Sequence, residues 1–207
     1  MQYHEIHPVN PQPRLISQAV AAVRHGGIIA YPTDSSYALG CCIGDKAAME
    51  QICRIRNLDK DHNFTLMCRD LSDISTYARI DNSDFRLIKS LTPGPYTFIF
   101  NATREVPRRL QNPRRKTIGI RVPDHPITLA LLEALGEPLM SVTLTMPGED
   151  LPLTDPHVIR ERLESQLKVI IDGGYCGYLP TTVIDFTGES PDVKRQGKGD
   201  SEFLSVH

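Results

Sequence analysis

Along most of the chain, apolar positions recur at the spacing of a helix or of a strand, and the two kinds of segment take turns. Residues 14–24 place apolar side chains on one helical face and end at Gly26-Gly27. Residues 28–31 form a continuous apolar run that Pro32 stops, which is typical of a strand covered on both faces. The opening of the chain therefore predicts a helix and a buried strand, with a loop at residues 33–36.

The same reasoning predicts an order of further elements. We expect helices over residues 45–56, 71–77, 83–90, 126–135 and 155–167, with Asp45 and Asp155 as N-caps. We expect strands over residues 64–68, 96–100, 117–122, 139–144, 169–172 and 182–186. Residues 104–116 are rich in Arg and Pro and predict a loop with a helical turn, whereas the polar tail 188–207 receives no element. One α/β domain of mixed strand direction, covering residues 1–207, accounts for this order.

Composition narrows the class of protein. The 207 residues are 40% apolar and 23% charged, which excludes the high-charge composition of a disordered chain. A net charge of −2 excludes a globally basic nucleic-acid binder, although a local patch can still exist. No window of about 18 residues is free of charge, so we expect no membrane span and no membrane partner.

The start of the chain and the cysteines bear on location. Residues 1–14 hold His, Glu, Asn and three prolines rather than a basic stretch followed by an apolar run, so they do not form a secretory signal. Five cysteines without CxxC or CxxH spacing argue against a zinc site and against a disulfide framework. These features predict a cytoplasmic protein with reduced thiols.

The sequence lacks the common catalytic motifs. No GxxxxGK[ST], GxGxxG, HExxH or GxSxG segment is present, so a P-loop, a dinucleotide site, zinc hydrolysis and a serine elbow are all unsupported. Arginines and short hydroxyl residues at predicted strand ends remain, and this combination of donors suits a small anionic ligand. Taken singly, an arginine is more often a solvated or salt-bridged surface group, and a strand threonine is more often a β-propensity choice.

Six segments in order resemble the YrdC/YciO family, also called the L-threonylcarbamoyladenylate synthase family. The resemblance covers about residues 14–197, and the Arg-for-Lys change at Arg54 together with residues 62–67 (HNFTLM) is closest to the YciO branch. The segments and the family patterns that they resemble are residues 31–40 (YPT(E/D)TxYGLG), 54–56 (KxR), 93–97 (PGPxT), 120–126 (RVPxHP), 181–185 (STVVD) and 195–197 (RxG).

The resemblance implies both a fold and a reaction. The fold is a twisted mixed sheet of the YrdC-like (RibB-like) type, with helices packed on it and a large concave cavity lined by positive charge. The reaction joins L-threonine, bicarbonate and ATP into threonylcarbamoyl-AMP and pyrophosphate, for threonylcarbamoyladenosine in tRNA. Such chemistry needs positioning and charge neutralisation rather than a protein nucleophile. Magnesium is expected to travel with the triphosphate, and no protein metal site is expected.

The resemblance also assigns site residues. Arg56 and Arg54, which match the KxR motif, are expected to be catalytic. The residues expected to hold threonine are Ser35, Arg121, Thr143 and Thr181, with Arg121 gripping the carboxylate. The residues expected to contact the nucleotide are Arg56, Asn63, Thr117, Thr145 and Arg195.

Several pocket positions depart from the synthase pattern. Thr143-Leu144-Thr145 stands in place of SxN, so a hydroxyl replaces an amide at Thr145. Arg54 replaces a lysine, Cys68 takes a position usually held by histidine, and the loop before Asn63 is two residues longer. We therefore expect a preserved fold and pocket with weak synthase activity or a shifted substrate.

A binding role is the alternative. Residues 104–121 carry seven Lys or Arg side chains against one acid, Glu105, a net +6 in 18 residues. Such a stretch can follow the backbone of double-stranded RNA or tRNA, and members of the family have been associated with such RNA. Under this alternative the nucleotide pocket is vestigial. The other interpretation of the stretch is a solvated loop that adds positive potential to the pocket.

Overall fold

The computed structural model describes residues 1–59 and 61–204, which form ten strands and six α-helices. The helices are α1 (Pro13–Arg24), α2 (Lys46–Arg56), α3 (Leu71–Tyr77), α4 (Asn82–Leu91), α5 (Pro126–Leu135) and α6 (Pro156–Leu163). The strands are β1 (Gln2–Glu5), β2 (Ile29–Tyr31), β3 (Ala38–Cys42), β4 (Thr65–Met67), β5 (Tyr96–Asn101), β6 (Thr117–Arg121), β7 (Leu139–Thr143), β8 (Val169–Asp172), β9 (Thr182–Asp185) and β10 (Asp192–Arg195). Two 3-10 turns, η1 (Arg108–Leu110) and η2 (Glu202–Leu204), complete the described elements.

Helix ends agree with the predicted caps. Asp45 accepts a hydrogen bond from the backbone N–H of Ala48 at 2.9 Å and so begins α2. Gly136 ends α5 in the left-handed region, with φ of 75°, which a glycine adopts without steric cost. Asp155 caps α6, but α6 ends at Leu163 rather than at Leu167. The sequence expectation was too long there, because residues 164–167 turn to enter β8.

Three strands were not expected from the sequence. β1 forms at the Pro-rich start of the chain because it pairs in parallel with β8, some 170 residues later. β3 follows the loop after β2 as an antiparallel partner, with Gly40 opposite Ile29. β10 forms in the polar tail by pairing with β9. Each depends on a neighbour that local periodicity does not identify.

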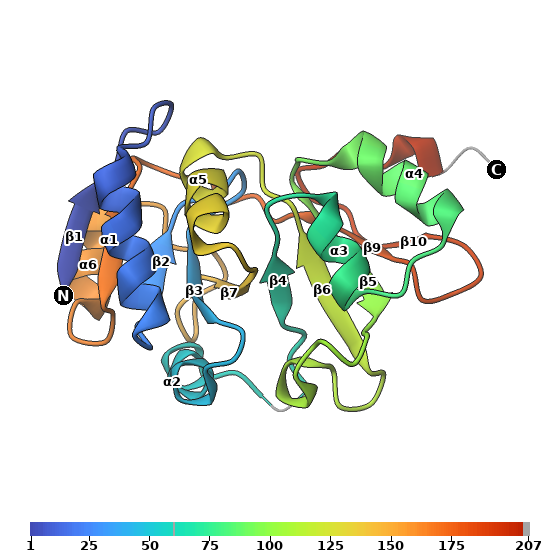
Figure 1. Cartoon of the computed structure of the whole chain (residues 1–207), viewed down its shortest axis with the longest axis horizontal. Coiled ribbons are helices and arrows are strands. Elements are labelled where there is room, and N and C mark those ends of the chain that lie inside the picture. The colour runs from blue at the N-terminus through green and yellow to red at the C-terminus, as the bar shows by residue number, and fades with distance from the viewer. Residues whose placement is uncertain (60, 205–207) are drawn as a thin grey trace.

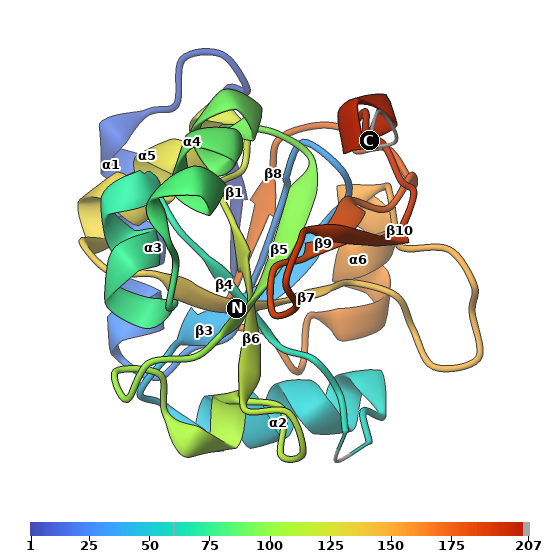
Figure 2. The ribbon, with the colours of Figure 1, turned by 90° about the vertical axis from the view of Figure 1, so that its right-hand side faces the viewer.

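All ten described strands belong to one mixed sheet. Their order across the sheet is β1-β8-β2-β3-β7-β4-β6-β5-β9-β10, and both parallel and antiparallel pairs occur (Figure 1). In Figure 2 the strands cross one another at successive angles, as a twisted sheet requires. The predicted α/β class and mixed strand direction are therefore confirmed.

Apolar residues fill two clusters, one on each face of the β2 end of the sheet. Ile29 and Tyr31 pack in the cluster that includes buried residues of α1 and α5, whereas Ala30 between them packs with residues of α2 and α6. Alternate residues of a strand point to opposite faces, so both faces of β2 are covered, as its unbroken apolar run predicts. No helix in the described part of the chain is long and apolar enough to cross a membrane.

Candidate functional site

A cavity of about 720 Å³ lies over the middle of the sheet, and alternate residues of five neighbouring strands line it. On β6, for example, Gly119 and Arg121 line the cavity, whereas Ile118 and Ile120 belong to the apolar core. The other lining pairs with this two-residue spacing are Ser141 and Thr143, Thr65 and Met67, Thr97 and Ile99, and Thr181 and Val183. The floor of the cavity is therefore one face of the sheet, and it carries the hydroxyl groups of Thr65, Thr97 and Ser141 beside the apolar side chains of Met67, Ile99 and Val183.

Gly119 keeps the centre of this floor hollow. A Cβ atom at this position would lie 2.9 Å from Thr65 Oγ1 and 3.3 Å from Thr97 Cγ2. Those distances are shorter than normal contacts, so a side chain here would push the neighbouring strands' threonines out of place. The missing side chain thus leaves room for a ligand between β4 and β5.

The loop after β2 holds the guanidinium of Arg121. Thr33 Oγ1 accepts hydrogen bonds from the backbone N–H groups of Ser35 and Ser36, both at 3.1 Å, which closes the loop into a tight turn. From this turn, Ser35 Oγ accepts from Arg121 Nη1 at 3.2 Å, and Asp34 forms an ion pair with Arg121 Nη2. Arg121 is only 7% exposed, and its Nε has no hydrogen-bond partner among the described residues.

Asp34 also connects this turn to the segment after β6. Its second carboxylate oxygen accepts a hydrogen bond from the backbone N–H of Asp124 at 3.0 Å. A single carboxylate therefore fixes both the guanidinium of Arg121 and the chain that follows it. Because Asp34 and Ser35 both hold Arg121, its guanidinium keeps a constant orientation in the lining of the cavity.

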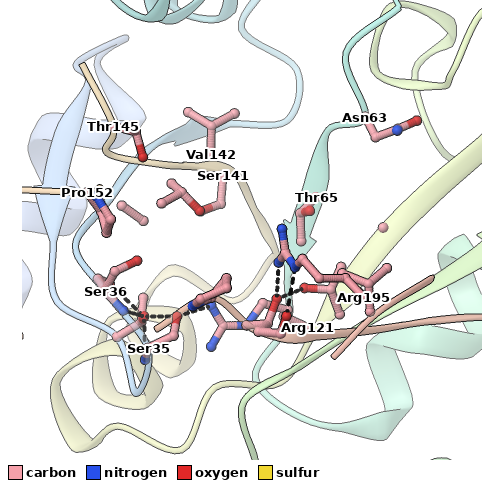
Figure 3. A pocket seen from close by; sticks show the side chains of 18 of the residues that line it. Ser35, Ser36, Asn63, Thr65, Arg121, Ser141, Val142, Thr145, Pro152 and Arg195 are labelled. Carbon is pink, nitrogen blue, oxygen red and sulfur yellow. Dashed lines mark hydrogen bonds between the residues drawn. The ribbon is translucent and has the colours of Figure 1, made fainter. Parts of the chain in front are cut away.

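Arg195 enters the same space from the end of β10. Its Nε and Nη2 donate to the backbone oxygen and hydroxyl of Thr181 at 3.0 and 3.1 Å, and Thr181 Oγ1 lies 2.7 Å from Thr97 Oγ1. Figure 3 shows Ser35, Arg121 and Arg195 gathered at one end of the cavity. Burial, and then the nearby Arg121, lower the pKa of Arg195, so a ligand with negative charge would relieve this repulsion.

Arg56 and His62 line the opposite wall. Arg56, at the C-terminal end of α2, donates through Nη1 to the backbone oxygen of Thr145, while its buried Nε lacks a partner among the described residues. Burial lowers the pKa of Arg56, and burial together with Arg56 lowers the pKa of His62, which is therefore neutral at pH 7. Asn63, whose Oδ1 accepts from Asn112 Nδ2 at 2.9 Å, completes this wall (Figure 3).

The structure brings most of the predicted site residues together. Eight of the ten predicted residues line this one cavity: Ser35, Arg56, Asn63, Arg121, Thr143, Thr145, Thr181 and Arg195. Arg54 and Thr117 do not line it.

Arg54 and Thr117 lie elsewhere for different physical reasons. Arg54 is exposed, since a residue two positions before Arg56 on a helix points to the other side of it. Thr117 shares a strand face with Gly119 but is 3% exposed, and it lies under the turn in which Asn112 N–H donates to its backbone oxygen at 2.9 Å. Cys68 is also outside the lining, because it follows β4 on the face opposite Met67.

The cavity is not uniformly positive, which corrects the expectation of a positively lined hollow. Its lining carries three arginines and three aspartates, Asp59, Asp61 and Asp150. The three aspartates and Arg195 are exposed, whereas Arg121 is buried and Arg56 is half-buried. Two of the three arginines thus lie where water is scarcer, and where a ligand charge counts more, than at the exposed aspartates.

The basic stretch of residues 104–121 is divided by the fold. Arg121 lies in the cavity, and ion pairs join Arg114 to Asp61 at 3.1 Å and Arg115 to Asp185 at 2.6 Å. Arg104, Arg108 and Lys116 instead line a separate hollow of about 470 Å³ that has no acidic residue in its lining. The surface is therefore less basic than the count along the chain indicates.

Sequence reasoning missed several lining residues. Thr65, Thr97 and Gly119 sit at alternate positions of predicted strands, so the two-residue period could have placed them on the faces of Met67, Ile99 and Arg121. No local signal could identify Tyr178, which lies in the loop between β8 and β9 and also lines the cavity.

Comparisons with known proteins agree on one group of relatives. The family model of the Sua5, YciO and YrdC proteins, which carries the description "Telomere recombination", matches residues 21–197. The uncharacterised protein YciO of Escherichia coli (strain K12) is 62% identical over 199 residues, which make up 96% of this chain and 97% of that protein. The crystal structure of E. coli YciO matches with a TM-score of 0.93 and covers 96% of this chain and 97% of that chain.

More distant relatives include named enzymes. The threonylcarbamoyl-AMP synthase of Coxiella burnetii (strain RSA 493 / Nine Mile phase I) is 30% identical over 177 residues, 84% of this chain and 94% of the synthase. The crystal structure of P. abyssi Sua5 complexed with L-threonine matches with a TM-score of 0.90 at 25% identity. That match covers 99% of this chain but 60% of the Sua5 chain.

Proposed function

Because the chain belongs to the Sua5, YciO and YrdC family, we propose that it binds L-threonine and magnesium-bound ATP in the cavity and converts them, with bicarbonate, into threonylcarbamoyl-AMP. Synthases among its relatives and the threonine-bound Sua5 structure support this choice of ligands. The observation that carries the proposal is the convergence of Arg56, Arg121 and Arg195 in one cavity, together with the hydroxyl groups of Ser35, Thr145 and Thr181. Guanidinium and hydroxyl donors together suit carboxylate and phosphate oxygens.

Threonine would occupy the end of the cavity near Arg121. The guanidinium of Arg121 lines this end and is held by Asp34 and Ser35, so its positive charge would attract the carboxylate of the amino acid. Thr181, 6% exposed and bonded to Arg195, offers a hydroxyl beside it. A small amino acid with both a carboxylate and a hydroxyl suits these donors.

The triphosphate would extend toward Arg56, with Arg195 between the two ligands. Both guanidiniums have a pKa lowered by burial, so negative phosphate oxygens would stabilise their charged forms. Asn63 and Thr145, which line the same cavity, would add neutral hydrogen bonds. We do not assign contacts to Arg54 or Thr117, because neither lines the cavity.

The reaction would proceed in two steps. The threonine amine bonds to the carbon of bicarbonate with loss of water, giving a carbamate. A carbamate oxygen then attacks the α-phosphorus in line, the bond from this phosphorus to the bridging oxygen breaks, and pyrophosphate leaves with the electron pair. The protein's part is to hold both reactants close and to neutralise charge on the phosphates, so no protein nucleophile is needed.

Substitutions in the wall predict a slow enzyme. Thr145 offers one hydroxyl where the resemblance predicts an amide, and its backbone oxygen already accepts from Arg56. Arg54, the counterpart of the motif's lysine, is exposed outside the lining. With two nucleotide contacts weakened or lost, the chain retains the binding groups for threonine better than those for ATP.

Pyrophosphate release tests the proposal directly. Purified protein is incubated with ATP, threonine and bicarbonate, each omitted in turn, and the nucleotide product is weighed by mass spectrometry. We expect release to need all three and the product to gain one mass unit from ¹³C-bicarbonate. A rate that persists without threonine would show that the substrate is wrong.

The alternative function is binding of double-stranded RNA or tRNA. It is supported by the hollow that is lined by three exposed cations, Arg104, Arg108 and Lys116, of which Arg104 pairs with Glu105 at 3.7 Å. Phosphate oxygens of an RNA backbone suit such a site. Under this alternative, RNA binds while ATP turnover is absent.

A further inference from the structure

The mouth of the cavity differs in chemistry from its floor. At the floor, Ser35, Arg121 and Thr181 are each less than 8% exposed and all polar. At the mouth, Leu151 is 59% exposed and Tyr178 is 55% exposed, and both line the same cavity. Two apolar side chains that face solvent at the rim of the same cavity offer a contact surface for an apolar part of a ligand.

We propose that Tyr178 is the stacking platform for the base of the bound nucleotide, with Leu151 and Pro152 as the apolar wall beside it. This inference rests on the proposed function, since it concerns the nucleotide of the same reaction. It assigns to the chain a specificity-determining residue that touches the base rather than the phosphates.

The loop that carries Tyr178 is anchored on both sides of this residue. Before it, Cys176 N–H donates to the backbone oxygen of Thr154 at 3.1 Å, and Gly177 packs so closely that a Cβ would lie 3.2 Å from the backbone oxygen of Ser35. After it, the backbone oxygen of Pro180 accepts from Lys198 N–H at 2.8 Å. Only the short stretch around Tyr178 projects, and its ends are fixed.

The bond between Cys176 and Thr154 also sets two loops side by side. Thr154 ends the loop between β7 and α6, which carries Leu151 and Pro152, and Leu153 N–H donates to Leu144 oxygen at 2.9 Å to close that loop. The apolar residues of both loops therefore reach the cavity from neighbouring positions. In Figure 3, Pro152 lies across the cavity from Asn63.

A nucleotide matches this division of the cavity. Its phosphates need cations and hydroxyl groups, whereas its base is a flat ring that stacks on aromatic side chains. Adenine stacked on tyrosine buries apolar area that is otherwise exposed on both partners. The volume of about 720 Å³ falls within the range of small-molecule sites, about 300–1,000 Å³.

Tyr175 supplies a matched control in the same loop. It is 77% exposed, more than Tyr178, but it is not in the cavity lining. A loss of apolar surface or a change in loop properties would affect both tyrosines alike. A role in stacking predicts an effect at Tyr178 alone.

The test compares ATP with inorganic tripolyphosphate, which has the charges but no base. Calorimetry measures both ligands, with magnesium, on the native protein and on Tyr178→Ala, Tyr178→Phe and Tyr175→Ala. We expect Tyr178→Ala to bind ATP about 10- to 100-fold more weakly while tripolyphosphate binding is unchanged. Tyr178→Phe keeps the ring and should bind ATP within about twofold of native, as should Tyr175→Ala.

A fluorescent base gives a second measurement. The chain has no tryptophan, so 2-aminopurine riboside triphosphate can be excited without protein emission. Its fluorescence should be quenched on binding to the native protein and to Tyr178→Phe, and remain bright when bound to Tyr178→Ala.

The outcomes separate this inference from the proposed function. If Tyr178→Ala weakens the binding of ATP and of tripolyphosphate equally, or does not weaken ATP binding, the stacking role is wrong. The proposal that the native protein binds ATP would still stand. Absence of ATP binding to the native protein would overturn both proposals. A similar loss of ATP affinity in Tyr175→Ala would attribute the effect to the loop rather than to stacking.

Discussion

Two groups of arginines in this protein differ in how the fold treats them. Arg121 and Arg195 line the cavity, where hydrogen bonds to Ser35, Asp34 and Thr181 fix their guanidiniums. Arg104, Arg108 and Arg114 lie on the surface stretch, and the side chains of Arg104 and Arg114 are 96% and 81% exposed. Long exposed side chains lose rotamer entropy when they bind, and salt screens their charge. The density of charge along a sequence is therefore a poor guide to a binding site, whereas burial and fixed orientation are good guides.

Removal of a cavity guanidinium should have the largest effect. We expect Arg121→Ala to weaken threonine binding by about 1.5–3 kcal/mol, the scale of hydrogen bonds to a charged group, as measured by calorimetry. The matched control is Arg108→Ala, which removes an exposed arginine and should leave threonine binding unchanged.

The Arg121→Ala variant also leaves the buried Asp34 without its ion pair, so its folding is checked by thermal unfolding. Asp34→Asn tests the positioning separately, since it keeps Arg121 but loosens it. Native threonine affinity in folded Arg121→Ala would contradict the account.

A side chain added to the cavity floor should have the second-largest effect. A methyl group at Gly119 would crowd Thr65 and Thr97, so we expect Gly119→Ala to lower the free energy of unfolding by about 1–3 kcal/mol and to reduce ligand binding. Gly44→Ala is the control, because a Cβ there meets no atom within 4 Å. Equal stability of the two variants in urea unfolding would show that the floor tolerates a side chain.

RNA binding tests the exposed arginines of the surface stretch. We expect any affinity for duplex RNA to come chiefly from Arg104, Arg108 and Lys116, because Arg114 and Arg115 pair with aspartates at 3.1 and 2.6 Å, closer than the 3.7 Å between Arg104 and Glu105. Each alanine substitution in the first group should reduce the slope of log affinity against log salt by about one. Filter binding at several salt concentrations measures this slope. If Arg114→Ala reduces this slope more than the substitutions of Arg104, Arg108 and Lys116 do, the RNA contacts Arg114 rather than the hollow, and the expectation is wrong.

The smallest expected effect is a dependence of stability on pH through the N-cap of α5. His125 Nδ1 accepts a hydrogen bond from Ile127 N–H at 3.2 Å as the cap of α5, and burial lowers the pKa of His125. As pH falls below about 6.5, the unfolded chain takes up this proton before the folded protein does, so stability decreases. The contribution is fully present above that pH.

His125→Asn separates this titration from that of other groups. An asparagine can cap the helix without titrating, so we expect the variant to lose less stability than the native protein between pH 7 and pH 5. Thermal unfolding across this range gives the comparison. An identical pH dependence in both proteins would exclude His125 as a contributor.

Sequence patterns predicted the helices better than the strands. Asp45 and Gly136 mark the ends of α2 and α5 through local hydrogen bonds and backbone conformation, which a short segment determines by itself. β1 and β3 depend on partners far away in the chain, so no local period identifies them.

The candidate site divides in the same way. Alternation in residues 117–122 predicts that Gly119 and Arg121 share a face, but not that Asp34 and Ser35 meet Arg121 there. The resemblance to a family supplied that convergence, and it also proposed Arg54 and Thr117, which the fold places outside the cavity. Where a side chain points at the end of a helix depends on the packing of that helix, which a motif does not encode.

A crystal structure with a non-hydrolysable ATP analogue and threonine tests the central claim most directly. The account predicts density for an amino acid against Arg121 and Ser35, and for a triphosphate between Arg56 and Arg195. An empty cavity, with the analogue bound instead at Arg104, Arg108 and Lys116, would contradict it.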